Sequence, residues 1–314
     1  MKLSLVVPCF NEQENVHAFY EACKQAFAGK IAEYEIVFVN DGSADNTWRE
    51  LKALFAEKRA EAHLKLVNFS RNFGKESAMY AGLQKAAGEY VCIIDADLQQ
   101  RPELVVDMVT FLDENADYDS VAAFQSERIE GRATSFLKKC FYKVINRMCE
   151  IDFRSGASDF RTFRRKVAEA ILSMPEYYRF SKGIFSWVGF KTHYIPYVAE
   201  ERNAGTTSWS IRKLFKYAID GIVSFSVFPL KIATYVGSFS ALAALIYMIV
   251  VIIQKCAFGI NVPGYATIVV LLLLIGGLQL ITTGIIGAYI ARIYIQSKQR
   301  PIFIEKEYVS YDEE

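Results

Sequence analysis

The 314-residue sequence lacks the common signatures of nucleotide-phosphate loops. No GxGxxG motif follows the first apolar run, which argues against a dinucleotide-dependent dehydrogenase. No GxxxxGK[ST] motif occurs, which argues against a P-loop ATPase. The formal net charge is only +1, so bulk charge gives no reason to expect nucleic-acid binding.

None of the six cysteines forms a CxxC pair, and no Cys/His cluster has the spacing of a zinc site. Several lie in apolar runs, as Cys92 does between Val91 and Ile93. We therefore expect buried free thiols in a reducing compartment. A secretory signal is also missing, because residues 1–8 are apolar but too short for its h-region and end at Pro8. The N-terminal part is therefore expected to stay in the cytoplasm.

Most of the excess hydrophobicity lies after Pro229. Residues 232–253 and 265–291 carry no formal charge, and each run is about long enough to cross a bilayer. The short link between them contains Pro263-Gly264, so the pattern predicts a transmembrane hairpin. The alternative is two buried helices of a soluble protein, but helices this long and uncharged are rarely covered on all sides.

Positive charges flank this predicted hairpin on both outer sides. Lys231 precedes the first span, and Arg292, Lys298 and Arg300 follow the second. The positive-inside rule then places both outer flanks in the cytoplasm.

Strand and helix patterns alternate through the first half of the chain. Repeated strand–helix units favour an α/β fold with a mostly parallel, doubly wound sheet, whose ligands bind beyond the carboxyl ends of the strands. Strands are expected at 3–7, 35–40, 64–69, 90–95 and 120–124, and helices at 16–27, 48–55, 76–87 and from Pro102 onward. Polar residues concentrate in the loops that follow four of these strands: Cys9-Phe10-Asn11-Glu12, Asp41-Gly42-Ser43, residues 70–75 and residues 95–99.

Two later segments combine an apolar stripe with basic residues. Residues 210–220 fit an amphipathic helix on an anionic membrane surface, and a predicted span follows soon after. Residues 137–148 fit either such a helix or a soluble helix that packs on the sheet.

Asp95-Ala96-Asp97 follows an apolar strand at the expected active edge. Two carboxylates that flank a small residue can turn toward one ion, and Mg²⁺ or Mn²⁺ prefers such oxygen ligands. Gln99 adds a neutral oxygen. The alternative is a polar strand end with capping carboxylates.

Two further loops carry candidate donor contacts. Asp41 either accepts hydrogen bonds from a nucleoside or only shapes a turn. Lys75 can approach a diphosphate, and Gly74 leaves room for close backbone contact. The alternative for Lys75 is a solvated loop lysine.

As an ordered set, the motifs resemble inverting family-2 glycosyltransferases over essentially the whole chain, and most closely their polyprenyl-phosphate branch. That branch includes dolichol-phosphate mannose synthases and bactoprenol glucosyltransferases. One departure is Thr207-Ser208-Trp209, which stands where the family usually has Ser-Lys. The matching motifs are Val7-Pro8-Cys9-Phe10-Asn11-Glu12, Asn40-Asp41-Gly42-Ser43, Arg71-Asn72-Phe73-Gly74-Lys75, Asp95-Ala96-Asp97-Leu98-Gln99, Ser158-Asp159-Phe160-Arg161 and residues 201–207.

The resemblance implies a GT-A nucleotide-sugar domain and a role for each matching residue. The donor would be held by Pro8, Phe10, Asn11, Glu12, Asp41, Lys75, Asp95 and Ala96, the metal by Asp95, Asp97 and Gln99, and the lipid phosphate by Arg128, Arg132 and Arg202. Asp97, Asp159 and Arg202 would act in catalysis, Asp159 as base or orienting group. Its alternative role is pairing with Arg161 or another arginine.

The resemblance further implies direct transfer of a hexose from a nucleotide-sugar to polyprenyl (undecaprenyl) phosphate, with inversion of the anomeric centre and with Mg²⁺ or Mn²⁺ as cofactor. UDP-glucose is the favoured donor, and GDP-mannose or a modified UDP-sugar is the alternative. Two other functions stay open: a processive polysaccharide synthase, for which one hairpin is too little to build a channel, and a non-catalytic membrane partner.

These expectations divide the chain into four parts. Residues 1–209 would form the cytoplasmic catalytic domain, 210–230 interfacial helices, 231–292 two transmembrane helices and 293–314 a cytoplasmic tail. The protein would lie in the bacterial inner (plasma) membrane, with its catalytic domain and both termini cytoplasmic. It would have no nucleic-acid partner, and the sequence leaves open whether it forms a homo-oligomer.

Overall fold

A computed structural model describes residues 1–58, 62–125, 157–198, 223, 226–258 and 264–312. In this part of the chain eight strands form one sheet. They are β1 (Leu3–Cys9), β2 (Tyr34–Asn40), β3 (His63–Phe69), β4 (Tyr90–Ile93), β5 (Ser120–Gln125), β6 (Ala157–Arg164), β7 (Thr192–Tyr197) and β8 (Glu305–Ser310). Their spatial order is β7-β5-β6-β4-β1-β2-β3-β8.

The centre of the sheet is parallel. Strand β1 pairs with β2 on one side and with β4 on the other, so that Leu3 lies opposite both Tyr34 and Tyr90. Nearly every residue of these strands is buried, because helices cover both faces of a parallel sheet. Their carboxyl ends therefore meet at one edge, where Asn11, Asp41 and Asp95 follow directly.

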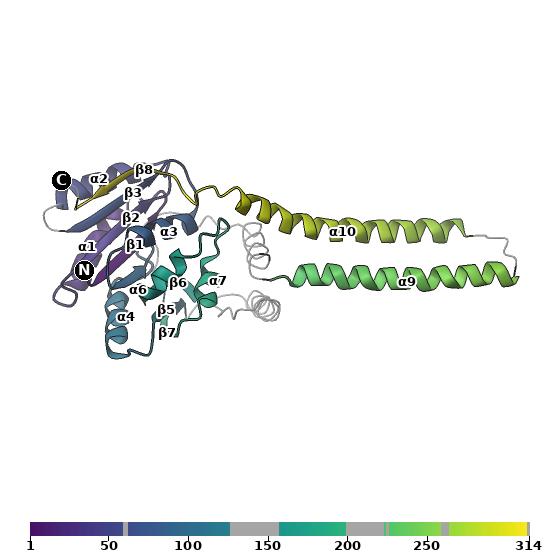
Figure 1. The fold of residues 1–314 in the computed structure, drawn as a ribbon. Coiled ribbons are helices and arrows are strands. Elements are labelled where there is room, and N and C mark those ends of the chain that lie inside the picture. Colours follow the sequence, from purple (N-terminus) through teal and green to yellow (C-terminus); the bar gives the residue numbers. More distant parts are fainter. Residues whose placement is uncertain (59–61, 126–156, 199–222, 224–225, 259–263, 313–314) are drawn as a thin grey trace.

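Helices form a layer on each face of the sheet (Figure 1). The first layer contains α1 (Val16–Phe27), α2 (Thr47–Lys58) and α4 (Glu103–Glu114), whose apolar residues join one core cluster with alternate residues of β1. The second contains α3 (Lys75–Lys85), α6 (Arg165–Leu172) and α7 (Ser181–Trp187), which pack on the opposite face. The fold is thus a three-layer α/β arrangement.

Strand β6 runs antiparallel to β4, with Ile93 opposite Arg161. Because of this direction, β6 begins at the edge where β4 ends. The residues near its start, including Asp159, therefore lie beside the Asp95 loop. Strand β5 pairs with β6 and is followed outward by β7.

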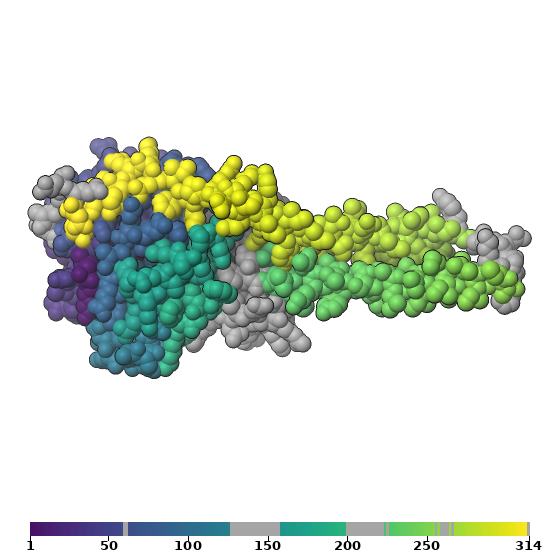
Figure 2. Space-filling model, in the orientation of Figure 1, coloured from purple at the N-terminus to yellow at the C-terminus, as the bar shows by residue number. Residues whose placement is uncertain are grey.

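Helices α9 (Phe228–Phe258) and α10 (Tyr265–Ser297) form a hairpin that extends far from the sheet (Figure 1). Their apolar stretches are Phe228–Gln254 and Thr267–Ser297. The most apolar 18-residue windows of the two stretches have mean hydropathies of 2.5 and 2.4, and neither window has a buried residue. This exposure is the opposite of what core helices of a soluble protein show. Figure 2 shows that the chain after α10 returns along the surface of the domain that contains the sheet.

The fold class expected from the sequence is confirmed, and the first five strands lie within two residues of their expected bounds. The strand β8 was not expected: it pairs antiparallel with the edge strand β3. Cys9, Cys23 and Cys92 are free and buried as expected, whereas Cys256 on α9 is exposed. The segments expected to be amphipathic helices, 137–148 and 210–220, lie outside the described residues.

Candidate active site at the carboxyl edge of the sheet

Lys75 joins two carboxylates that come from different strands. Its Nζ lies 2.5 Å from Asp95 Oδ1 and 3.4 Å from Asp159 Oδ2. Lys75 is the first residue of α3, Asp95 follows β4 and Asp159 lies on β6. The structure thus brings three predicted site residues together at the expected edge.

The charges of this cluster stabilise one another. Burial opposes the charge of Lys75, but Asp95 and Asp159 outweigh it and hold the pKa of the ammonium above its usual value. Burial also opposes ionisation of Asp159, but Lys75, Lys182 and Arg161 outweigh it and hold its pKa below the usual value. Both groups are therefore charged at neutral pH.

The Asp95-Ala96-Asp97 segment forms a tight loop. The side chain of Gln100 accepts a hydrogen bond from the Asp95 backbone N–H at 3.0 Å and donates one to Asp95 Oδ2 at 3.0 Å. The backbone N–H of Gln99 donates to Asp97 Oδ1 at 3.2 Å. Ala96 is buried, and Asp97 is 7% exposed. Gln100 was missed in the sequence, because nothing distinguishes it there from Gln99.

Asp41 is fixed by the loop that leads to Lys75. Its Oδ1 accepts the backbone N–H of Phe73 at 2.6 Å, and its Oδ2 accepts that of Gly74 at 2.9 Å. Burial raises the pKa of Asp41 to about 6, although these two N–H groups oppose the rise. Gly42 has φ +61°, and a Cβ there would lie 2.2 Å from the carbonyl carbon of Arg71. Glycine at position 42 therefore allows the loop after β2 to approach the loop after β3 closely.

The loop after β1 is tied to the loop after β2. Asn11, at φ 58°, accepts the backbone N–H of Ala44 on its Oδ1 at 2.9 Å, and its own N–H donates to Ser43 Oγ at 3.0 Å. The N–H of Glu12 donates to Thr47 Oγ1 at 2.8 Å. Pro8 lies within β1 opposite Val39, and Phe10 is 47% exposed. An exposed ring at this edge is a platform on which a planar base can stack.

Glu76 connects the cluster to α7. Its Oε2 accepts the backbone N–H of Ser181 at 2.9 Å and also the Ser181 hydroxyl. Burial and the nearby Asp159 raise the pKa of Glu76 to about 7. This contact could not be predicted from the sequence, because the two residues are 105 positions apart.

Arg161 is a buried cation behind Asp159. Its guanidinium stacks 3.7 Å from the Phe185 ring centre, and its Nη2 donates to the Ser158 carbonyl at 3.0 Å. Within the described residues, Arg161 Nε and Asp159 Oδ1 are buried and have no hydrogen-bond partner. No ion pair between Asp159 and Arg161 is formed there, so Asp159 keeps an unused acceptor.

The donor set fits a divalent cation. Asp95 and Asp97 offer carboxylate oxygens in one loop, and a magnesium-type ion uses one or two protein carboxylates and completes its shell with water and substrate phosphates. In the described ranges no group of three or more His, Cys, Asp or Glu residues could hold a metal by itself. Arg128, Arg132 and Arg202, expected at the lipid phosphate, lie outside those ranges.

Comparisons with known proteins agree with this architecture. The family model described as "Glycosyl transferase family 2" matches residues 4–172, and one described as "GtrB C-terminal hairpin" matches residues 228–293. The chain is 42% identical over 98% of its length to a bactoprenol glucosyl transferase of Shigella phage SfV, and 41% identical over 97% to a putative glycosyltransferase CsbB of Bacillus subtilis (strain 168). These alignments cover 98% and 91% of the relatives.

Among solved structures, glucosyl-3-phosphoglycerate synthase from Mycobacterium tuberculosis aligns with a TM-score of 0.48 at 16% identity. That alignment covers 71% of this chain and 76% of the other. The family model matches more than half of the chain, and the relatives match nearly all of it, hairpin included. The chain therefore belongs to glycosyl transferase family 2.

Proposed function

We propose that the protein transfers glucose from UDP-glucose to a polyprenyl phosphate at the cytoplasmic face of a bacterial inner membrane. The observation that carries the proposal is the combination of a charged cluster at the carboxyl edge of the sheet with an exposed apolar hairpin in the same chain. The full-length similarity to a protein named bactoprenol glucosyl transferase supports the same acceptor.

The donor side of the site would be built from three loops. Pro8, Phe10, Asn11, Glu12 and Asp41 would hold the nucleoside, and Lys75 and the Asp95-Ala96-Asp97 loop would face the diphosphate. A Mg²⁺ or Mn²⁺ ion held by Asp95 and Asp97, with Gln99 nearby, would neutralise the nucleoside diphosphate as it leaves.

The acceptor needs positioning more than activation. The second pKa of a phosphomonoester is about 6, so the lipid phosphate carries a nucleophilic oxygen at neutral pH. This oxygen attacks the anomeric carbon as the bond to the diphosphate breaks, which inverts that centre. Asp159, charged and with one free acceptor, would orient the acceptor or the sugar. Arg128, Arg132 and Arg202 would hold the lipid phosphate.

The first test is a transfer assay with the Asp97→Ala variant. Membranes that contain the protein are incubated with undecaprenyl phosphate and a panel of radiolabelled nucleotide-sugars, and the lipid is then extracted. We expect label from UDP-glucose to enter the lipid, and we expect Asp97→Ala to lower the rate at least about 100-fold, because a bound metal supplies several kcal/mol.

Asp107→Ala removes an exposed carboxylate from α4 and serves as the matched control, with unchanged activity. If the Asp97→Ala variant makes as much lipid-linked product as the native chain, Asp97 is not a ligand of a required metal. If label enters the lipid from GDP-mannose and not from UDP-glucose, the donor is GDP-mannose rather than UDP-glucose.

A further inference from the structure

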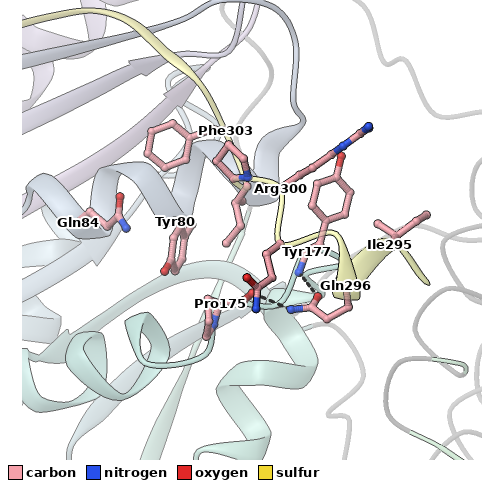
Figure 3. A pocket seen from close by; sticks show the side chains of 11 residues that line it. Tyr80, Gln84, Pro175, Tyr177, Ile295, Gln296, Arg300 and Phe303 are labelled. Carbon is pink, nitrogen blue, oxygen red and sulfur yellow. Dashed lines mark hydrogen bonds between the residues drawn. The ribbon is translucent and has the colours of Figure 1, made fainter. Parts of the chain in front are cut away.

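A pocket of about 530 Å³ lies away from the candidate active site, where the hairpin meets the catalytic domain. Figure 3 shows it between α3, the segment around Pro175 and Tyr177, and the chain that leaves α10. Lys75 at the active site and Gln84 in the pocket are nine residues apart on α3, which is about 13 Å along a helix axis. The pocket is therefore separate from the Lys75 cluster, and its volume is typical of small-ligand sites.

Among the described residues, the lining includes several hydrogen-bond donors and no carboxylate. Gln84, Gln299, Arg300 and the hydroxyl of Tyr177 line it, and within the described residues these polar groups have no hydrogen bond or ion pair. The side chain of Gln296 is already used: it accepts the Tyr177 N–H at 2.9 Å and donates to the Pro175 carbonyl at 3.2 Å (Figure 3). Figure 3 shows the Arg300 side chain on the Tyr177 side of the pocket, pointing away from Gln84 and Tyr80. A guanidinium without an ion-pair partner suits an anion with several acceptor oxygens.

The carboxylates near the pocket do not line it. Glu305, at the start of β8, pairs with Lys85 at 3.0 Å. Glu176, beside Tyr177, is not among the residues that line the pocket. Among the described residues that line the pocket, Arg300 is the one with a formal charge.

The pocket opens where the apolar span ends. Ile295 and Gln296 belong to the last turn of α10, and the apolar stretch itself ends at Ser297. The Arg292 guanidinium lies 5.2 Å from the Tyr178 ring centre close by. Tyrosines and basic residues at the end of a span are typical of headgroup depth.

We propose that this pocket binds the phosphate headgroup of an anionic phospholipid, and that the bound lipid fixes the catalytic domain against the membrane surface. The Arg300 guanidinium supplies the donors for the phosphate oxygens. The acyl chains continue along the exposed apolar surface of α10. The proposal does not depend on which sugar the active site transfers.

The test is lipid retention by the full chain in nanodiscs made of phosphatidylcholine with a small fraction of phosphatidylglycerol. Native mass spectrometry after extraction counts the retained lipids. We expect phosphatidylglycerol to be retained about tenfold over phosphatidylcholine, and Arg300→Gln to lower that preference about tenfold. Lys306→Gln, which removes an exposed charge from β8 outside the pocket, is the matched control and should retain the lipid as the native chain does.

Gln84→Glu is a second variant, which places a carboxylate in the pocket and should also weaken retention. If Arg300→Gln and Lys306→Gln lower the preference for phosphatidylglycerol equally, the lipid is attracted by the overall positive charge and not by the pocket, which would overturn the proposal. Equal retention of phosphatidylglycerol and phosphatidylcholine by the native chain would overturn it as well. Parallel experiments with inorganic phosphate and with polyprenyl phosphate identify which phosphate-containing molecule the pocket binds. Retention of either of these in place of phosphatidylglycerol would also overturn the proposal.

Discussion

At the scale of single residues, Lys75 sets the charge balance of the active edge. It touches both Asp95 and Asp159, and no other lysine or arginine forms an ion pair with either carboxylate in the described part of the chain. A nearby opposite charge lowers the pKa of a carboxyl group by about 1–3 units. Lys75 therefore keeps Asp159 ionised in a buried position.

Lys75→Met should move the acid limb of the transfer rate to higher pH. Loss of the ammonium removes the main force that lowers the pKa of Asp159, so we expect the limb in kcat/KM to shift upward by about one unit or more. The control Lys85→Met changes a lysine at the other end of α3, which pairs with Glu305. An acid limb at the same pH in both variants would show that Asp159 does not govern the rate.

Glu76 gives a separate, stability-based pH dependence. Its folded pKa of about 7 lies above the ordinary 4.5, so the folded state binds more protons than the unfolded state between these pH values. Stability must therefore fall as pH rises through this window, by about 1–3 kcal/mol. Glu76→Gln, which keeps an acceptor for Ser181, should flatten this part of the curve of unfolding free energy against pH.

The matched control is Glu89→Gln, which changes an exposed glutamate in the turn before β4. It should leave the curve unchanged. A slope that persists in Glu76→Gln would assign the pH dependence to another group, and Asp41, with a pKa of about 6, would be next to test.

The sequence allowed prediction of those site residues that follow strand ends. Asp41 and Asp95 stand within two residues of an apolar strand, and Lys75 ends the loop that follows another, so the parallel pattern alone places them at one edge. The contacts of Gln100 and Glu76 could not be predicted, because they depend on how a loop folds and on how α7 packs. The unpaired state of Asp159 Oδ1 likewise depends on three-dimensional neighbours.

At the scale of elements, a buried ion pair and its hydrogen bonds connect the neighbouring parallel strands β1, β2 and β3. Glu35 on β2 is fully buried, and it pairs with Lys65 on β3 at 2.8 Å and accepts the Ser4 hydroxyl of β1 at 2.5 Å. The backbone N–H of Ala87, in the turn before β4, also donates to Glu35 at 2.6 Å. One carboxylate thus satisfies donors from three other segments.

Glu35→Ala should destabilise the catalytic domain by about 3–5 kcal/mol, because it leaves the Lys65 ammonium buried without its partner. Chemical unfolding of the full chain, followed through the signal of the catalytic domain, measures this loss. Glu33→Ala is the control: the Glu33 side chain is 70% exposed, and its ion pair in the described structure is with the amino terminus at 3.3 Å. A loss below about 1 kcal/mol in Glu35→Ala would mean that the domain relaxes to hydrate Lys65.

Elements with near-continuous apolar sequences were predictable, whereas strands that depend on tertiary partners were not. The first four strands are buried on both faces and are mostly apolar, although Ser4, Glu35 and Lys65 interrupt the first three. Strand β8 has the sequence EKEYVS, which reads as a charged tail. It becomes a strand because it covers the open edge of β3.

At the scale of the whole molecule, the chain beyond α10 attaches the hairpin to the catalytic domain. The Tyr289 hydroxyl of α10 donates to the Ser226 carbonyl at 2.6 Å, so the start of α9 and the end of α10 lie close together. Beyond α10, Phe303 stacks on Phe69 at 4.8 Å, and β8 joins the sheet. Removing everything after residue 231 would therefore remove a strand of the catalytic domain along with the membrane anchor.

A cleaner variant replaces residues 228–297 with about ten Gly and Ser residues and keeps β8. Such a linker spans about 17 Å, enough for chain ends that lie this close. We expect binding of UDP-glucose, measured by calorimetry, to stay within about twofold, and transfer to a water-soluble short-chain prenyl phosphate to continue. Transfer to undecaprenyl phosphate in vesicles should fall at least about tenfold, because the active edge is no longer held at the membrane surface.

A control that also lacks residues 298–314 should lose donor binding, because the loss of β8 exposes the edge of β3. If the linker variant loses donor binding and lipid transfer equally, the hairpin acts on folding rather than on access to the lipid.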